Sequence, residues 1–234
     1  MTALTASGLL RRAGRLDKER WAALVALVIL TVVSSFLSEY FLQVQNLLNI
    51  LRQVSYTGII ALGMTFVIIS GGIDLSVGSM AAFVGSLGIL ALNALAGRSQ
   101  GLAVAVAVTI ALMSGLLCGF ANGILITKGR IAPFIVTLGT MALFRSLSLY
   151  MADAGEFRSA ASLFGELGSA TLVRIPLPVL VMLALAAALA FVLSRTRYGR
   201  YVRAVGSNAR VARYSAIDVD RTRLIAYALS LIHI

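Results

Sequence analysis

Long apolar runs, separated by short polar segments, dominate the chain. Six of them approach the roughly 20 residues that an α-helix needs to cross a bilayer. They lie near residues 21–37, 54–69, 77–95, 102–126, 131–151 and 175–193. A seventh begins at Leu224 and has only about a dozen residues, too few to cross at about 1.5 Å of rise each. The pattern predicts an all-α fold, a polytopic transmembrane helical bundle with six full spans and the start of a seventh. We also expect the chain to be truncated at its C-terminus.

The composition leads to the same class of protein. Of the 234 residues, 59% are hydrophobic and only 12% are charged, and the mean hydropathy is +0.95. A soluble domain of this length needs far more polar surface to cover its core. We therefore expect one membrane domain over residues 21–234, preceded by a basic segment over residues 1–20.

The cations are unevenly placed, and their positions predict an orientation in the membrane. The net charge is +11, and the cations gather in residues 1–20 and 195–223. If the N-terminus is cytoplasmic, these segments and the connection "TKGR" at 127–130 fall on the cytoplasmic side, and the connection 152–174 falls outside. This alternation obeys the positive-inside rule. The same clustering argues against a nucleic-acid-binding protein, which needs a basic face on a folded soluble domain.

A carboxylate stands between the second and third apolar runs, in the stretch "SGGIDLSVGS" at 70–79. A charge near hydrocarbon is expensive and often marks a functional site. One interpretation is that Asp74 or Ser76 caps the following helix and satisfies its free N–H groups. The other is that Gly71 and Gly72 relax the backbone, so that a helix interruption inside the bundle turns the carboxylate toward a polar pathway. The residues alone leave both open, and one carboxylate can serve both purposes.

The fourth run contains small residues at helical spacing. Gly115, Gly119 and Gly123 recur every fourth residue, and Asn122 stands beside them. Small residues on one face of a membrane helix let another backbone approach closely, so packing is the simpler role for the glycines than contact with a ligand. The amide of Asn122 needs a polar partner at this depth. It either links two helices or lines a cavity.

The basic segment 195–223 contains two short helical patterns. Tyr201, Ala204 and Val205 lie at helical spacing, Gly206-Ser207-Asn208 interrupts them, and "ARVARYSAI" follows. A short amphipathic piece of this kind can lie on anionic lipid. Alternatively, two helices joined by a glycine turn and held between two spans form a rigid knob that docks into a partner's groove.

The chain carries no recognisable catalytic motif. A single cysteine, Cys118, excludes an intrachain disulfide, the only histidine is His233, and no metal-ligand spacing, phosphate-binding loop or nucleophile motif is present. We expect neither enzymatic activity nor a cofactor. The runs also lack the paired acids of ion-driven carriers, which favours a partner ATPase as the source of energy.

Three segments together carry a family resemblance. They are "GMTFVIISGGIDLSVGSM" at 63–80, "NGILITKGRIAPFIVTLGTMALFRSL" at 122–147 and "TRYGRYVRAVGSNARVARYSAIDVDRTRLIAYALS" at 196–230. In this order and spacing they resemble the permease subunits of bacterial ABC importers for monosaccharides, the ribose/xylose/arabinose/galactose type of inner-membrane permease. The resemblance extends over almost the whole chain from about Phe41.

The resemblance implies the membrane-spanning permease subunit of an ATP-driven sugar importer, which forms the translocation pathway and hydrolyses nothing itself. Implied partners are a cytoplasmic ABC ATPase, a periplasmic sugar-binding protein and a second permease subunit, either the same chain or a similar paralogue. The substrate is a small-molecule sugar. The protein is then a multi-pass protein of the bacterial inner membrane with a cytoplasmic N-terminus, residues 21–234 form an incomplete permease domain, and residues 195–223 form its cytoplasmic coupling loop.

The resemblance places Gly71 to Ser76 near the pathway and the basic segment at the ATPase. We expect the translocation pathway and its helix break to involve Gly71, Gly72, Asp74, Ser76, Ser79, Asn122, Thr137 and Thr140. We expect coupling to the ATPase to involve Gly199, Arg200, Tyr201, Ala204, Gly206, Asn208, Ala212 and Ile217. The family commonly has glycine where this chain has Ala216, which puts the local turn in question.

Other functions fit the same pattern less closely. A permease of a nucleoside or branched-chain amino-acid ABC importer shares the architecture and differs in the binding protein that serves it. A stand-alone secondary carrier needs intramembrane charge pairs that the runs lack. A membrane anchor or scaffold has no need of polar, glycine-broken helices.

Overall fold

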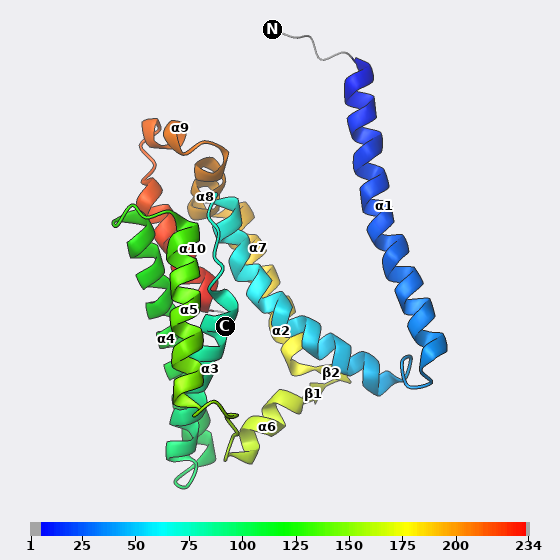
Figure 1. The fold of residues 1–234 in the computed structure, drawn as a ribbon, viewed down its shortest axis with the longest axis vertical. Coiled ribbons are helices and arrows are strands. Elements are labelled where there is room, and N and C mark those ends of the chain that lie inside the picture. Colours follow the sequence, from blue (N-terminus) through cyan, green and yellow to red (C-terminus); the bar gives the residue numbers. More distant parts are fainter. Residues whose placement is uncertain (1–5, 233–234) are drawn as a thin grey trace. The chain divides into compact units, whose positions relative to one another are not determined.

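The computed structural model describes residues 6–232, and these are almost entirely helical (Figure 1). Residues 1–5 of the predicted basic N-terminus and residues 233–234 of the predicted seventh span lie outside the described part. The elements in chain order are α1 (Ala6–Leu37), α2 (Val44–Ile69), α3 (Val77–Leu95), α4 (Gln100–Thr127), α5 (Pro133–Met151), α6 (Ser162–Ser169), β1 (Thr171–Leu172), β2 (Ile175–Pro176), α7 (Leu177–Arg195), α8 (Arg197–Ser207), α9 (Ala209–Tyr214) and α10 (Val219–Ile232).

The chain divides within α2 into two compact units, one that ends at Ile50 and one that starts at Leu51. The first unit contains α1, whose apolar part Trp21–Leu37 has no buried side chain. An all-round apolar helix surface is typical of a helix that faces lipid. The apolar part is shorter than the roughly 20 residues of a full crossing. The six-span count is therefore not established by helix length.

Five helices of the described residues are long and apolar enough to cross a membrane: α2, α3, α4, α5 and α7. Each coincides with a predicted span. The largest difference is in α2, which begins at Val44 rather than at 54, because its first turns carry polar residues such as Gln45 and Asn46 that a hydropathy window excludes. Only 11% to 28% of each apolar window is buried within the chain. The remaining apolar surface needs lipid or another chain to cover it.

The second unit is built around α3, α4, α5 and α10, which pack side by side (Figure 1). Close helix contacts occur where a glycine lies at the interface. A Cβ added to Gly123 of α4 would lie 2.6 Å from a methyl group of Leu224 in α10, and one added to Gly63 of α2 would lie 2.5 Å from the carbonyl of Ser230. These contacts support the packing interpretation of Gly123.

One core cluster joins six helices at the end of the unit that carries α8. Its largest buried members are Phe66 of α2 and Tyr227 of α10, and Val202 of α8 packs in the same cluster. The other buried members are Val67 of α2, Ile126 of α4, Val136 of α5, Leu189 of α7 and Ala226 of α10. The cluster fixes α8 against the membrane helices instead of leaving it as a tethered loop.

The connection 152–176 is more ordered than predicted and is not purely helical. It contains α6 and the two-residue strands β1 and β2, paired antiparallel around a turn in which Val173 and Arg174 have φ of 52° and 66°. The described residues are mostly helical, as predicted, and these two short strands are the exception. No Gly or Asn marks the turn, so the sequence carried no hairpin signal. The side chain of Asn93 anchors the connection, donating to the carbonyl of Arg158 at 2.9 Å and accepting from the N–H of Ala160 at 2.8 Å.

Candidate functional site: a helix break and a docking knob

Residues 70–76, here called the break, separate α2 from α3 and begin with a Schellman turn. The N–H of Gly72 donates to the carbonyl of Val67 at 2.9 Å, and the N–H of Gly71 donates to that of Ile68 at 3.0 Å. This hydrogen-bond pair places Gly71 in the left-handed region, with a φ of +79°. Glycine adopts that conformation without strain from a Cβ. Gly71 therefore ends α2 at a fixed point.

The rest of the break has no regular secondary structure, and its residues alternate between two environments. Gly72, Asp74 and Ser76 are buried, whereas Ile73 and Leu75 are 53% and 38% exposed. In Figure 1 the break runs back along the bundle, and α3 starts deeper in the bundle than α2 ends. The polar side chains thus face the interior, and the apolar ones face outward.

Asp74, Ser76 and Asn122 form a buried hydrogen-bond network. The Asp74 Oδ1 accepts the backbone N–H of Ser76 at 2.9 Å and its hydroxyl at 2.6 Å. The Ser76 Oγ in turn accepts the side-chain N–H of Asn122, on α4, at 3.0 Å. Asp74 is 3% exposed, and the other two side chains are fully buried. Asn122 therefore links α4 to the break, one of the two roles expected for it.

The network does not cap α3 in the predicted way. Ser76 occupies the N-cap position, yet its side chain accepts no bond from the first helical turn. Asp74 instead accepts the N–H of the N-cap residue itself. The prediction that one of these side chains satisfies the first N–H groups of the helix is wrong. The Oδ2 of Asp74 and the Oδ1 of Asn122 are buried and have no hydrogen-bond partner among the described residues.

Tyr227 of α10 is part of this site, and the sequence analysis did not single it out. Its hydroxyl donates to the carbonyl of Ile73 at 3.0 Å, across 154 positions of sequence. A Cβ added to Gly72 would lie 2.7 Å from the same hydroxyl. Gly72 therefore leaves room for the Tyr227 hydroxyl beside the break. A tyrosine in an apolar run needs a buried partner for its hydroxyl, which is the signal that could have identified it.

The other residues predicted for the pathway use their hydroxyl hydrogens within their own segments. Ser79 donates to the carbonyl of Ser76 at 2.8 Å, Thr137 to that of Pro133 at 2.8 Å, and Thr140 to that of Val136 at 3.1 Å. The structure brings Gly71, Gly72, Asp74, Ser76 and Asn122 together. Thr137 and Thr140 lie on α5, with no hydrogen bond to the break in the described part of the chain.

Residues 196–218, here called the knob, contain α8 and α9. The knob lies between α7 and α10. Asn208 separates its two helices: its backbone is extended, with φ −160° and ψ 106°, and its Oδ1 accepts the N–H groups of Arg210 at 3.0 Å and Val211 at 3.1 Å. One residue thus ends α8 and caps α9. The buried side chains of Val205 and Ala212 hold the two helices together, in one cluster with the start of α10.

Gly206 has a different role from the one predicted. It lies inside α8, and a Cβ there would overlap the carbonyl oxygen of Ile69 and lie 3.6 Å from the Cα of Ser70. The prediction of a glycine turn is wrong, because Asn208 makes the turn. Gly206 instead allows α8 to touch the last residue of α2 and the first residue of the break. The knob and the break are therefore in direct contact.

The residues predicted to couple to an ATPase divide into an inner and an outer set. Gly199 and Ala212 are buried, and Ala204 and Ile217 are partly buried, so all four hold the knob together. A Cβ on Gly199 would overlap the carbonyl of Leu193 at the end of α7. The exposed members of the set are Arg200, Tyr201, Gly206 and Asn208.

The turn after α9 repeats the geometry found at the break, with alanine in the glycine position. The N–H of Ile217 donates to the carbonyl of Ala212 at 3.0 Å, and the N–H of Ala216 donates to that of Arg213 at 3.1 Å. Ala216 has a φ of +60°. The resemblance led us to question this turn because the family commonly has glycine there. The turn forms nevertheless, with the strain that a Cβ brings.

Tyr198 fastens the knob to two membrane helices. Its ring stacks on Phe66 of α2 with centroids 6.1 Å apart, and its hydroxyl donates to the carbonyl of Thr222 in α10 at 3.2 Å. Burial raises the pKa of this phenol well above its ordinary value. It therefore remains a hydrogen-bond donor across physiological pH. Among residues 21–230, whose side chains the structure describes, no three His, Cys, Asp or Glu gather closely enough to hold a metal ion.

Known proteins share this sequence over most of its length. The chain is 36% identical over 210 residues to a ribose import permease of Haemophilus influenzae, a match that covers 88% of this chain and 63% of the relative. It is 37% identical over 207 residues to a D-allose transport system permease of Escherichia coli (87% of this chain, 61% of the relative). It is 34% identical over 218 residues to an autoinducer 2 import system permease of Yersinia enterocolitica (89% and 63%).

The chain thus spans just under two thirds of the length of these relatives. No solved structure matches it. The model of a permease family matches residues 46–232, which include the break, Asn122 and the knob. With a match over most of its length, this chain belongs to the family described as the permease component of the branched-chain amino acid transport system.

Proposed function

We propose that this protein is the membrane-spanning permease subunit of an ATP-driven importer for monosaccharides. The subunit forms the translocation pathway and leaves ATP hydrolysis to a partner. The relatives that carry this proposal are named as ribose and D-allose permeases and are 36% and 37% identical to the chain. We further propose a cytoplasmic ABC ATPase, a periplasmic sugar-binding protein and a second permease subunit as its partners.

The knob is the single observation that supports this function best. It is two short helices fixed between α7 and α10, with a buried apolar core and basic and aromatic side chains outside, among them Arg200, Tyr201 and Tyr214. A rigid projection of this kind suits docking into a partner's groove better than a loose loop does. We therefore propose that residues 195–223 act as the coupling loop that contacts the ATPase.

The contact between Gly206 and the end of α2 suggests how movement passes into the membrane. When the ATPase subunits close on ATP, the knob moves with them. Because α8 touches Ile69 and Ser70, that movement reaches the break directly. The Asp74 network then keeps the start of α3 attached to α4 while the pathway opens to one side or the other. In this proposal Asp74 positions the break and does not bind sugar.

For the membrane topology we propose six full spans, with the apolar part of α1 as the first and α10 as the start of a seventh. The N-terminus and the knob are cytoplasmic, because the connections rich in Lys and Arg then share one side. Residues 1–20 form a basic cytoplasmic segment, and residues 21–234 belong to the permease domain. Ser79, Thr137 and Thr140 are proposed to lie near the pathway.

Two other functions make different predictions. The family description names branched-chain amino acids, so a permease for those or for nucleosides shares the fold and differs in the ligand of the binding protein. A stand-alone carrier moves substrate with no ATPase present. The following experiment tests both alternatives.

The test is co-purification of the gene product with the ATPase encoded beside it, followed by ATPase activity in liposomes. We expect sugar-loaded binding protein to stimulate hydrolysis. Tyr201→Ala and Tyr214→Ala, both at exposed positions of the knob, should weaken the complex. Tyr150→Ala is the matched control, because Tyr150 is also exposed (82%) but lies at the C-terminal end of α5, outside the knob. Sugar transport without any ATPase, or equal losses in all three variants, would falsify the coupling assignment.

A further inference from the structure

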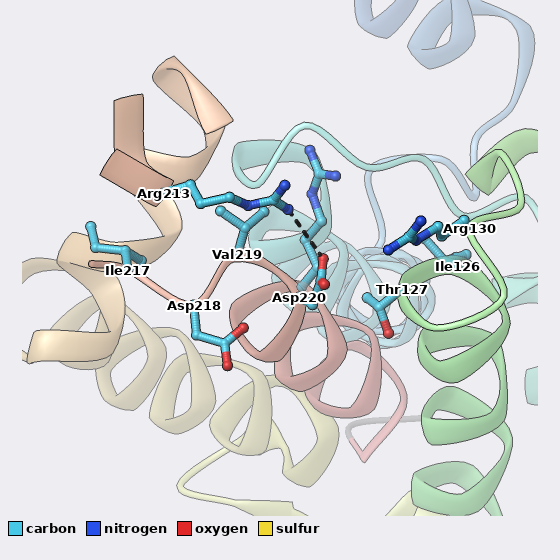
Figure 2. Close-up of a pocket in the computed structure, with 9 residues that line it drawn as sticks. Ile126, Thr127, Arg130, Arg213, Ile217, Asp218, Val219 and Asp220 are labelled. Atoms are coloured by element: carbon cyan, nitrogen blue, oxygen red, sulfur yellow. Dashed lines mark ion pairs between the residues drawn. The ribbon is translucent and has the colours of Figure 1, made fainter. Parts of the chain in front are cut away.

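A polar cavity of about 600 Å³ lies between the C-terminal end of α4 and the junction of the knob with α10. Three arginines from three segments line it: Arg130 from the α4–α5 connection, Arg213 from α9 and Arg223 from α10. Two aspartates, Asp218 and Asp220, line it as well. Figure 2 shows Arg213 and Arg130 reaching toward the cavity from opposite sides, with Asp220 between them. Positive charge therefore exceeds negative charge on its walls.

The two aspartates already have partners. One Asp220 oxygen lies 3.7 Å from an Arg213 nitrogen, and one Asp218 oxygen accepts the backbone N–H of Arg221 at 2.9 Å. By contrast, the Arg223 Nε is buried and has no hydrogen-bond partner among the side chains of residues 21–230 or the described backbone. In the same part of the chain no hydrogen bond or ion pair engages the Arg130 side chain. Two guanidinium groups thus line the cavity with donors to spare.

We propose that this cavity binds a small phosphate ester that carries hydroxyl groups. Guanidinium groups bind phosphate through paired, charge-assisted hydrogen bonds, which assigns the phosphate to Arg130 and Arg223. The free carboxylate oxygens of Asp218 and Asp220 accept hydrogen bonds from hydroxyl groups. The volume exceeds what an inorganic phosphate alone would fill. A soluble polyol phosphate and the headgroup of a phospholipid such as phosphatidylglycerol share this chemistry.

A ligand bound in the cavity would affect the break through Arg223. The guanidinium group of this residue lies 3.8 Å from the position of a Cβ on Gly71, the residue that ends α2. A phosphate bound to Arg223 therefore sits beside the turn between α2 and the break. The site is independent of the transport proposal, because it depends only on the cavity and its charges.

The experiment uses the protein in nanodiscs of phosphatidylcholine and measures binding of radiolabelled glycerol 3-phosphate by equilibrium dialysis. We expect saturable binding that inorganic phosphate displaces, and a loss of about tenfold or more in affinity for Arg130→Gln and for Arg223→Gln. Lys128→Gln is the matched control, because it removes the same charge from the same connection without lining the cavity. Its affinity should be unchanged.

A second variant covers the case in which an arginine substitution prevents folding. Asp220→Asn removes a negative charge from the cavity and frees Arg213, so it should tighten binding of glycerol 3-phosphate. Repeating the titration in nanodiscs that contain phosphatidylglycerol separates the two ligand sources. Loss of soluble binding there identifies the lipid, and unchanged binding identifies a soluble ester. Absence of binding in both nanodiscs, with no lipid retained in native mass spectrometry, overturns the proposal, as does an equal loss in Lys128→Gln.

Discussion

The chain turns sharply after α2 and again after α9, and it uses the same backbone hydrogen bonds both times. In each turn one N–H reaches back five residues and the preceding N–H reaches back three, and an aspartate follows shortly after. The first turn has Gly71 at its left-handed position, and its aspartate, Asp74, is 3% exposed. The second has Ala216 there, and its aspartate, Asp218, is exposed.

The difference lies in what each aspartate bonds. Asp218 is a conventional helix cap, which accepts the N–H of Arg221 in the first turn of α10. Asp74 accepts both hydrogens of Ser76 and, through Ser76, holds Asn122 of α4. Water can replace bonds at an exposed cap, but it cannot reach a buried network. The same local turn therefore serves a helix start at the knob and a connection between helices at the break.

The largest effect is expected where the two regions touch. Gly206→Ala places a Cβ on the carbonyl of Ile69, and neither backbone segment can yield easily. We expect the free energy of unfolding in mixed detergent micelles to fall by about 3 kcal/mol or more. Gly139→Ala in α5 is the control, since nothing lies within 4 Å of its added Cβ. It should be neutral or slightly stabilising. Equal behaviour of the two variants would mean that the knob does not pack on α2.

The next effect separates the two aspartates. Asp74→Ala leaves the N–H and the hydroxyl of Ser76 without their acceptor, so we expect a loss of about 2–4 kcal/mol in the free energy of unfolding. Asp218→Ala removes an exposed cap and should lose only about 1 kcal/mol. Asp74→Asn keeps an acceptor oxygen and should fall between them. If both alanine variants lose the same amount, burial does not distinguish the two turns.

A smaller pair of effects, opposite in sign, tests the left-handed positions. Gly71→Ala introduces a Cβ at a φ of +79° and should lower the free energy of unfolding by about 1–2 kcal/mol. Ala216→Gly relieves the same strain but also increases the entropy of the unfolded chain. We therefore expect the free energy of unfolding to rise by a net amount of about 0.5–1 kcal/mol. Both are measured by the same unfolding titration. A loss in Ala216→Gly contradicts the geometry described for this turn.

The smallest effect belongs to the ion pair that joins α9 to α10. Arg213 and Asp220 approach to 3.7 Å with side chains that are 69% and 46% exposed. Exposed pairs of this kind contribute little, so Arg213→Gln should change the free energy of unfolding by less than about 1 kcal/mol. A larger loss would indicate that the pair, rather than the buried cluster around Ala212, holds the knob together.

Much of the fold could be predicted because a helix that crosses a membrane needs an apolar run of a characteristic length. The spans 54–69, 77–95, 102–126, 131–151 and 175–193 each correspond to a helix, since crossing hydrocarbon demands about 20 apolar residues. The helical start of α2 and the strands β1 and β2 were missed. The first turns of α2 are too polar for a hydropathy window, the hairpin lacks the usual turn residues, and β2 was counted as the start of the run 175–193.

The candidate site was predicted as a set of residues but not as an arrangement. The glycines and Asp74 stood out because charge and backbone freedom are conspicuous between apolar runs. Tyr227 did not, because its partner is the carbonyl of Ile73, 154 positions away. Gly206 was predicted as a turn residue. Its observed role, close contact with Ile69, could not be predicted because that contact exists only after α8 packs on α2.

The sequence by itself determined the class of protein, the membrane helices and the places where the chain must turn. These depend on composition, span length and glycine, which are properties of short stretches. Only the tertiary structure decided that Asp74 is buried and linked to Asn122 through Ser76, and that the knob rests on the end of α2. Those outcomes depend on which distant segments meet, because a buried polar group is stable only where the fold brings it a partner.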